Sequence, residues 1–435
     1  MKKNILVILG LIAMAILGVL FFPKILHSFA KDIAPIDDSD LQLQKVSVPD
    51  QDNAHFDLIK LGSIIYFPKD KKRTIKDMTD GKTWDAQLAE EIVSRNIQAF
   101  ECFTQAAHKP KYQNPELADP ANITMTIEFP WIPFCGQMTE FSTIRALYLA
   151  KQGKDKEALD EALHSVHIGQ KIQEAQGGLI EHLVATNMKK AGLNAVQKII
   201  PSTKLSSVEL KQYAQELNQY YGNENNFIRT LKIDYHAMSS MLDLMVSNPA
   251  EAVTMFEEKE SQELELNKKI KDKYYFQPNK TKLLFAEKIR TYIKSVNQSY
   301  GEIKTTEMQQ PAPTNPEISS EENAVGKYIF SIGSMQMPPL RLKTHQVYGD
   351  LSVAVTQAML AIKAYKNDTN NYPASLNELV PDYLSSVPQD SFDRKPLKYS
   401  AAKKILYSVG EDLQDSGGSV GEDLRKMADP TFNLN

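Results

Sequence analysis

A group of carboxylate and imidazole residues between positions 161 and 182 is the first part of the sequence that suggests chemistry. Glu161 and His164 form an E-x-x-H pair, and His167, Glu181 and His182 follow. On a helix this spacing places a carboxylate and an imidazole on adjacent turns, as in a di-iron bundle. A di-iron site needs two such motifs and two further carboxylates, and only one motif is present. We therefore interpret the histidines as ordinary helix-surface histidines and not as a ligand set.

Sequence signatures of common enzymes are absent. The chain contains no H-E-x-x-H, P-loop or G-x-G-x-x-G motif. Cys135 and a distant histidine could be drawn as a nucleophile pair, but nothing local supports the pairing. We predict no catalytic residue, and an enzyme with a site in the helical part of the chain remains an alternative.

A second candidate for chemistry is an acidic, glycine-rich loop near the C-terminus. The segment from Ile405, on a predicted strand, to Leu424 contains five acidic and no basic residues. Calcium prefers carboxylate and carbonyl oxygens on a flexible loop. Two interpretations stay open, a structural calcium site and a solvated acidic loop.

The N-terminus predicts a membrane anchor over residues 1–24. Lys2 and Lys3 precede an uncharged apolar run at residues 5–22, long enough to cross a bilayer as one helix. The lysines would remain in the cytoplasm, so we expect a single-pass protein of the bacterial inner membrane with its body in the periplasm. A cleaved signal peptide ending near Ala30 is the alternative.

Composition limits the remaining classes. A chain of 435 residues suggests two or three domains, and 42% hydrophobic with 24% charged residues indicates a folded body. A net charge of −4 argues against a nucleic-acid partner. The two cysteines, Cys102 and Cys135, could form one disulfide in an oxidising compartment or remain as buried thiols.

The chain between the anchor and residue 320 divides into three predicted parts. Residues 25–81 are a polar tether with a strand-like patch at 58–67 and a solvated basic loop at 69–73. Residues 82–300 are a helical body, an irregular bundle or solenoid, with a hairpin turning at Gly153 and a capping box at Ser206. Residues 301–320 are a proline-rich linker, predicted to be extended.

Residues 321–435 predict a small α+β domain. A helix opening at Pro338–Pro339 carries an apolar stripe from Leu351 to Tyr365, and the chain turns at Tyr372–Pro373. Short runs at 397–399 and 405–409 predict a β-hairpin that packs on this helix.

The motifs YP at residue 372, QDSFDRKP at 389 and SVGEDLQDSGG at 408 resemble the C-terminal globular domain of type II secretion major pseudopilins. The chain as a whole also resembles membrane-anchored bacterial envelope proteins for which the likeness implies no activity. By matched position, the pseudopilin resemblance makes Asp412 a calcium ligand, Asp423 a second and Asp415 a weaker third. Carbonyl groups near Ser408 and Gly410 would complete the shell.

The sequence departs from the pseudopilin pattern in ways that argue against a pilus subunit. Ser391 and Asp393 replace the proline and glycine of the D-P-W-G motif, and Leu413 replaces the glycine after Asp412. The N-terminus also lacks a prepilin leader. We therefore predict a mainly α, membrane-tethered, non-enzymatic interaction or scaffold protein with protein partners. An accessory of a secretion or pilus-like assembly is a further alternative.

Overall fold

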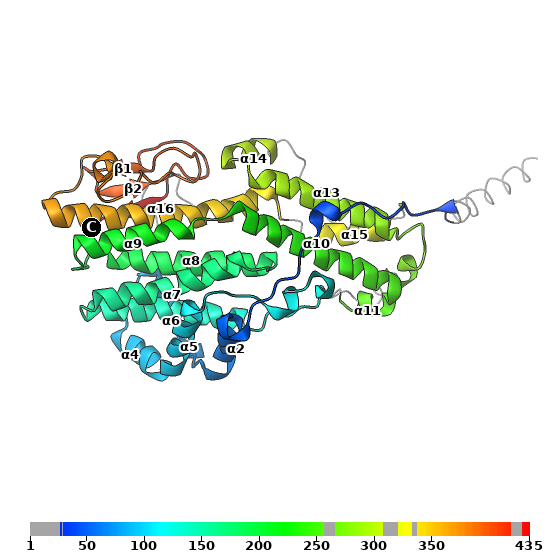
Figure 1. Ribbon diagram of the computed structural model, residues 1–435, viewed down its shortest axis with the longest axis horizontal. Coiled ribbons are helices and arrows are strands. Elements are labelled where there is room, and N and C mark those ends of the chain that lie inside the picture. The colour runs from blue at the N-terminus through cyan, green and yellow to red at the C-terminus, as the bar shows by residue number, and fades with distance from the viewer. Residues whose placement is uncertain (1–26, 28, 256–265, 308–320, 333–336, 419–428) are drawn as a thin grey trace, which may run out of the picture.

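A computed structural model describes residues 27, 29–255, 266–307, 321–332, 337–418 and 429–435. Helices dominate these residues, and their one sheet has three short strands, so the predicted mainly α fold is confirmed at this level (Figure 1). The helices before residue 200 are α2 (His55–Ile64), α3 (Lys72–Asp80), α4 (Ala86–Arg95), α5 (Ile97–His108), α6 (Ile132–Lys151), α7 (Asp155–Glu174) and α8 (Leu179–Ile199). Those after it are α9 (Ser207–Glu216), α10 (Glu224–Ser247), α11 (Pro249–Val253), α13 (Pro278–Val296), α14 (Tyr300–Glu307), α15 (Ala324–Ile332) and α16 (Pro339–Thr369).

The pair formed by α6 and α7 is the predicted helical hairpin. Gly153 lies in the turn between them with φ of +76°, a conformation that glycine adopts without a side-chain clash. Ser206 accepts a hydrogen bond from the backbone N–H of Glu209, while the Glu209 carboxylate accepts one from the Ser206 backbone. This capping box begins α9, as the sequence predicts.

Helix α8 connects the three large apolar cores of the molecule. Its first residue, Leu179, belongs to a core formed mainly by α10, α13 and α15. Ala185 and Met188 belong to the core that α2 to α7 build, and Leu193 and Val196 to the core shared with α9 and α16. Since one helix contributes to all three cores, a shift of α8 must disturb packing throughout the molecule.

The C-terminal module, defined as residues 370–418 and 429–435, lies on α16 (Figure 1). Its strands β1 (Lys398–Ser400), β2 (Ile405–Tyr407) and β3 (Thr431–Asn433) form an antiparallel sheet in the order β1-β2-β3. The predicted hairpin is confirmed as β1 and β2, whereas β3 is a strand that sequence analysis missed. The module shares a core with α7, α8, α9 and α16, to which it contributes Phe392, Leu406 and Phe432. This core therefore combines residues from before and after the predicted linker.

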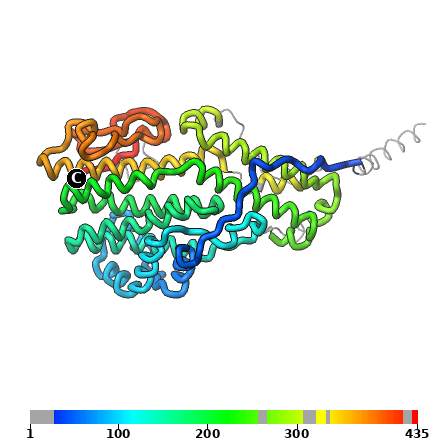
Figure 2. Tube along the Cα trace, in the orientation of Figure 1, coloured from blue at the N-terminus to red at the C-terminus, as the bar shows by residue number. Residues whose placement is uncertain are grey.

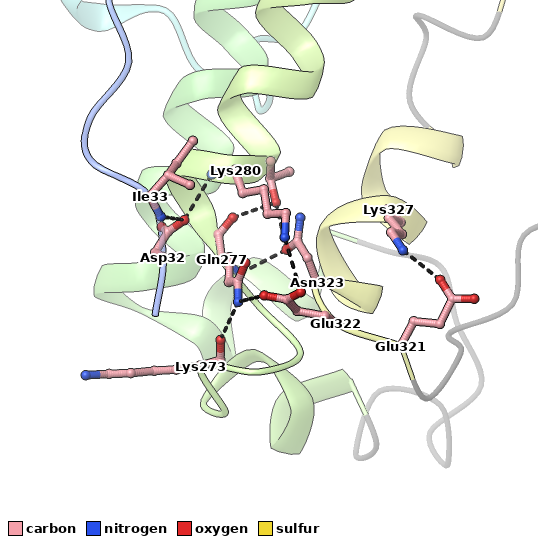
Figure 3. Close-up of polar contacts among 10 residues, drawn as sticks. Asp32, Ile33, Lys273, Gln277, Lys280, Glu321, Glu322, Asn323 and Lys327 are labelled. Carbon is pink, nitrogen blue, oxygen red and sulfur yellow. Dashed lines mark hydrogen bonds and ion pairs between the residues drawn. The ribbon is translucent and has the colours of Figure 1, made fainter. Parts of the chain in front are cut away.

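The N-terminal segment, residues 29–44, is held against the end of the molecule formed by α10 and α13. The carboxylate of Asp32 accepts hydrogen bonds from the backbone N–H groups of Asn279 (2.7 Å) and Lys280 (3.0 Å) in the first turn of α13. Figure 3 shows the contact with Lys280. A carboxylate at this position accepts hydrogen bonds from N–H groups that have no partner within the helix, and its negative charge interacts favourably with the helix dipole. Further along, the Asp40 carboxylate accepts from Arg290 at 2.6 and 2.9 Å, and Leu41 is buried.

Three predictions of local structure are wrong. Residues 58–64 of the strand-like patch are helical in α2, where Leu58 and Leu61 face the core and Ile59 is exposed. The basic residues 69–73 form a 3₁₀ turn and the start of α3 instead of a loop, although their side chains are exposed as predicted. Residues 301–307 of the linker are helical in α14, which Tyr300 anchors with a buried ring, while 308–320 lie outside the described residues.

Two other predictions concern the membrane anchor and the possible disulfide. None of the described helices is long and apolar enough to cross a bilayer, and the predicted anchor at residues 5–22 lies outside the described residues. Cys102 and Cys135 are free, buried thiols in the same apolar core.

Candidate functional site

The predicted calcium ligands are exposed where the structure describes them. Asp412 Oδ1 accepts from the backbone N–H of Gln414 at 2.9 Å, and Asp415 Oδ1 accepts from that of Gly417 at 3.1 Å. Asp415 Oδ2 also lies 3.6 Å from Lys398 Nζ, a positive charge that competes with a cation. Asp423 lies outside the described residues, among which no cluster of three or more His, Cys, Asp or Glu side chains suits a metal. Calcium binding remains a prediction.

Buried carboxylates that the sequence analysis did not single out hold the loops of the module. Asp390 accepts from the Ser408 hydroxyl (2.9 Å) and from the backbone N–H of Phe392 (3.0 Å) and Val409 (2.8 Å). Asp429 Oδ2 accepts from two backbone N–H groups of the acidic loop, those of Ser416 and Gly418, both at 2.8 Å. Hydrogen bonds to a carboxylate are stronger than those between neutral groups, so these two residues fix the loop conformation.

The carboxylate and imidazole residues of α7 and α8 do not converge on one centre. Glu161 accepts from Ser142 Oγ at 2.8 Å and lies 3.5 Å from His164 Nδ1, whereas His167 faces Glu216 at 3.0 Å. His182 packs on the ring of Phe227 with a centroid distance of 4.9 Å. His164 and His182 are buried, so describing them as helix-surface histidines is wrong, and Glu161 is buried as well.

A cleft of about 750 Å³ lies between the helical bundle and the C-terminal module, and we call it the polar cleft. The middle of α16 provides one side, and residues 381–391 with Arg394 of the module face it. The chain from Lys211 in α9 to Asn226 in α10 provides another wall, and Tyr300 of α14 lines the cleft as well. His182, Thr186 and Lys189 of α8 line the deep part. A volume of this size suits a small-molecule or short-peptide ligand.

Lys189 closes the deep part of the cleft and is only 3% exposed. Its Nζ donates to Gln170 Oε1 (2.7 Å) and Gln173 Oε1 (2.9 Å) on α7, and to the backbone oxygen of Tyr220 (2.6 Å). These acceptors use all three ammonium hydrogens. Burial lowers the pKa of Lys189 to about 8, because removal from water penalises the charged form. The lysine therefore joins α7, α8 and the chain before α10 and has no spare donor for a ligand.

Hydrogen bonds between walls fix the cleft. Tyr221 OH donates to Gln357 Oε1 at 2.7 Å, and Gln357 Nε2 donates to the Ala214 backbone oxygen at 3.0 Å. Asp350 Oδ1 on α16 accepts from the backbone N–H of Gly222 at 2.6 Å. The α9 to α10 connection is thereby attached to α16 at two points, so much of the cleft is pre-formed.

Charged groups of both signs line the more open part of the cleft. Lys343 and Arg394 are positive, and Glu224 and Asp350 are negative, yet none of the four forms an ion pair within 4.0 Å with another described residue. Burial lowers the pKa of Lys343 and raises that of Asp350, because each charge is partly removed from water. Such unpaired charges are suited to bind complementary charges on a ligand.

Sequence analysis did not find this cleft, whose walls come from segments far apart in the chain. One signal was available in α16. Lys343, Gln346, Asp350 and Gln357 recur at helical spacing beside the apolar stripe that was used to predict the helix. A second, polar stripe on a helix that is otherwise largely buried indicates a face that contacts water or a ligand.

No protein-family model matches the chain, and comparisons with curated proteins and with solved structures also found no match. The interpretation of the polar cleft therefore depends on its own geometry.

Proposed function

We propose that this protein is a membrane-tethered binding protein of the bacterial envelope that holds a small polar ligand in the polar cleft. The observation that carries the proposal is a cleft of about 750 Å³ in which charged side chains from separate segments have no ion-pair partner among the described residues. The lysine-flanked apolar run at residues 5–22 supports the tether and the envelope location.

The contacts in the cleft favour binding over catalysis. The most buried cation, Lys189, donates to three fixed protein acceptors, which suits a structural role better than that of a nucleophile. Burial lowers the pKa of His182 to about 3, so its imidazole is neutral at physiological pH. Its partner in the structure is the Phe227 ring, whereas a general base would be expected beside a hydroxyl or thiol nucleophile.

The test is ligand screening with a variant that fills the cleft. Gln346 lines the cleft, and its side chain makes no hydrogen bond to another described residue, so Gln346→Trp should occupy space without removing a contact. Gln87→Trp, at an exposed position of α4, is the matched control. The full-length protein in detergent would be screened by thermal unfolding with maltotriose, pooled tripeptides, nucleoside monophosphates and dicarboxylic acids.

A compound that binds the cleft raises the unfolding midpoint of wild type and of Gln87→Trp, but not that of Gln346→Trp. At a concentration 100 times its Kd, such a ligand adds about 2.7 kcal/mol of stability. Binding that Gln346→Trp leaves unchanged, or no binding by any class of compound, contradicts the proposal.

A further inference from the structure

The chain just before α13 carries exposed lysines that have no ion-pair partner among the described residues. Its short helical stretch holds Leu266 and Ile270 in the core formed with α10 and α13, which leaves Lys268 on the outer face. Lys271 and Lys273 follow in the turn after this stretch, and Lys273 extends away from its neighbours (Figure 3). All three lysines are exposed, and none lies within ion-pair distance of another described residue. We call these three residues the lysine patch.

Acidic side chains near the lysine patch already have partners. Asp272 Oδ2 lies 3.3 Å from His27 Nδ1. Two further carboxylates are paired near the start of α13, namely Glu321 with Lys327 at 2.6 Å and Glu322 with Lys280 at 3.4 Å (Figure 3). Among the described residues, the lysine patch therefore has no internal counter-ion, and its positive potential favours an anionic partner.

His27 holds this part of the molecule beside the predicted membrane anchor. Its ring stacks on that of Tyr274, next to Lys273, with a centroid distance of 4.0 Å. His27 comes five residues after Phe22, the last residue of the apolar run. Five residues rise about 7.5 Å as an α-helix and span at most about 18 Å when extended. The headgroup layer on each side of a bilayer is about 5–7.5 Å thick. If residues 5–22 span the bilayer, the surface around His27 lies between contact with the headgroups and about 13 Å beyond them.

An exposed aromatic side chain lies on the same surface. Phe29 is 75% exposed, the highest fraction among the large apolar side chains that the structure describes. It comes two residues after His27, whose ring also contacts that of the half-buried Tyr275 at a centroid distance of 4.9 Å. Aromatic rings are favoured where headgroups meet acyl chains, and lysines are favoured beside anionic headgroups. This combination of side chains suits a lipid surface better than it suits water.

We infer that this end of the molecule docks on anionic phospholipid headgroups of the membrane that holds the anchor. The lysine patch binds headgroup phosphates, and Phe29 enters the interface beside the anchor. Each lysine near an anionic surface shifts the docking equilibrium by about fivefold, so three lysines shift it by about a hundredfold. The inference rests on the tether in the proposed function and is independent of the ligand in the polar cleft.

The experiment measures the exposure of this surface in full-length protein reconstituted into lipid nanodiscs. One set contains phosphatidylcholine alone, and the other contains equal parts of phosphatidylcholine and phosphatidylglycerol with the same acyl chains. Hydroxyl radicals, which carry no charge, oxidise exposed aromatic side chains, and mass spectrometry measures the product. We expect phosphatidylglycerol to lower the oxidation of Phe29 and Tyr274 by at least about threefold. Sodium chloride at about 1 M should restore it, because the Debye length is then only about 3 Å. Tyr407, a half-buried residue of the module, should react equally in both lipids.

A variant without the lysine patch shows whether its charge is responsible. This variant combines Lys268→Gln, Lys271→Gln and Lys273→Gln. We expect it to show equal oxidation of Phe29 in the two lipids. The matched control removes the same charge at exposed lysines elsewhere that have no ion-pair partner among the described residues, and it combines Lys69→Gln, Lys72→Gln and Lys204→Gln. The control should keep the full effect of phosphatidylglycerol.

Equal oxidation of Phe29 in the two lipids by the wild-type protein overturns the inference, and this is the result expected if the acidic run at residues 257–265 neutralises the lysine patch. Protection that persists in the patch variant also overturns it, because the charge of the patch is then not the cause. Failure of the tether gives a different result. The protein would then elute separately from both kinds of nanodisc, which overturns the tether and the docking together. Ligand binding in the polar cleft is measured in detergent and is unaffected by either failure.

Discussion

Replacing Gly192 by alanine tests the closest helix contact that positions the polar cleft. A Cβ added at Gly192 of α8 would lie 2.5 Å from the backbone oxygen of Ala162 and 2.8 Å from Val166 Cγ2, both on α7. An ordinary contact needs at least 3.4 Å, so the two helices must separate locally by roughly 0.9 Å (3.4 minus 2.5). Backbone atoms cannot rotate away as a flexible side chain can.

The expected loss of stability follows from the contacts that this separation weakens. A gap of about 0.5–1 Å removes about a quarter to a half of the dispersion energy of each contact. Overpacking of this kind costs about 1–3 kcal/mol, and here we expect the upper end because the seam is fully buried. Alanine regains about 1 kcal/mol through its helix propensity. The net expectation for Gly192→Ala is a loss of about 2 kcal/mol.

Gly136 provides a control with the same substitution and the opposite expected sign. It is an exposed residue of helix α6, and a Cβ there meets no atom within 4 Å. Gly136→Ala should therefore stabilise the protein by about 0.5–1 kcal/mol. Urea unfolding of both variants, followed by the fluorescence of Trp84 and Trp131, measures the difference. Our account of the α7–α8 seam is refuted if Gly192→Ala is as stable as wild type.

Three further predictions concern buried carboxylates and calcium. Asp390→Asn should lower the free energy of unfolding by about 2 kcal/mol, measured by urea unfolding, because an amide NH₂ replaces one acceptor in a buried set of three donors. Burial raises the pKa of Glu181 from 4.5 to about 7, so the folded state binds its proton more tightly than the unfolded chain does. Glu181 thus contributes up to about 3 kcal/mol of stability at low pH that is lost as pH rises from 4.5 to 7. Glu181→Gln should flatten that part of the stability profile, and an unchanged profile would contradict this. If the acidic loop binds calcium, millimolar calcium should raise the unfolding midpoint of the full-length protein, and Asp412→Ala should abolish the rise; no rise in wild type would end the calcium prediction.

Much of the local helical structure can be predicted from this sequence because its signals are short in range. Gly153 marks the α6–α7 turn, Ser206 and Glu209 define the start of α9, and Pro339 begins α16. In each case the residue that determines the boundary lies within one helical turn of it. Agreement between local preference and tertiary packing makes these predictions reliable.

The failures have an equally local cause. The run at residues 58–67 is apolar at seven of its ten positions, and neither a two-residue nor a 3.6-residue period stands out. Its β-branched isoleucines favoured a strand. Contacts with distant α5 and α6 decide the outcome. Strand β3 is three residues long and pairs with β2, which lies well before it in the sequence. Such a short segment carries almost no pattern of its own.

The site was harder to predict than the fold because its residues come from distant segments and form a site only after folding brings them together. Lys343 and Asp350 are visible in the sequence as part of a polar stripe on α16. Glu224, the exposed first residue of α10, and Arg394, in a loop of the module, line the same cleft. No spacing in the sequence relates them. By contrast, the acidic loop is conspicuous in sequence, yet its described carboxylates bind local N–H groups.

The N-terminal segment connects the proposed tether to the accessibility of the cleft. Asp32 binds the first turn of α13, Tyr235 OH donates to Asp38 at 2.6 Å, and Asp40 pairs with Arg290, so the segment is attached at three points. It leaves the molecule at the end formed by α13 and α15, while the C-terminal module lies towards the opposite end (Figure 2). If residues 5–22 span the bilayer, the attachment turns the α13 and α15 end towards the membrane. The polar cleft, which the module helps to form, is then held away from the lipid surface, where soluble ligands can reach it.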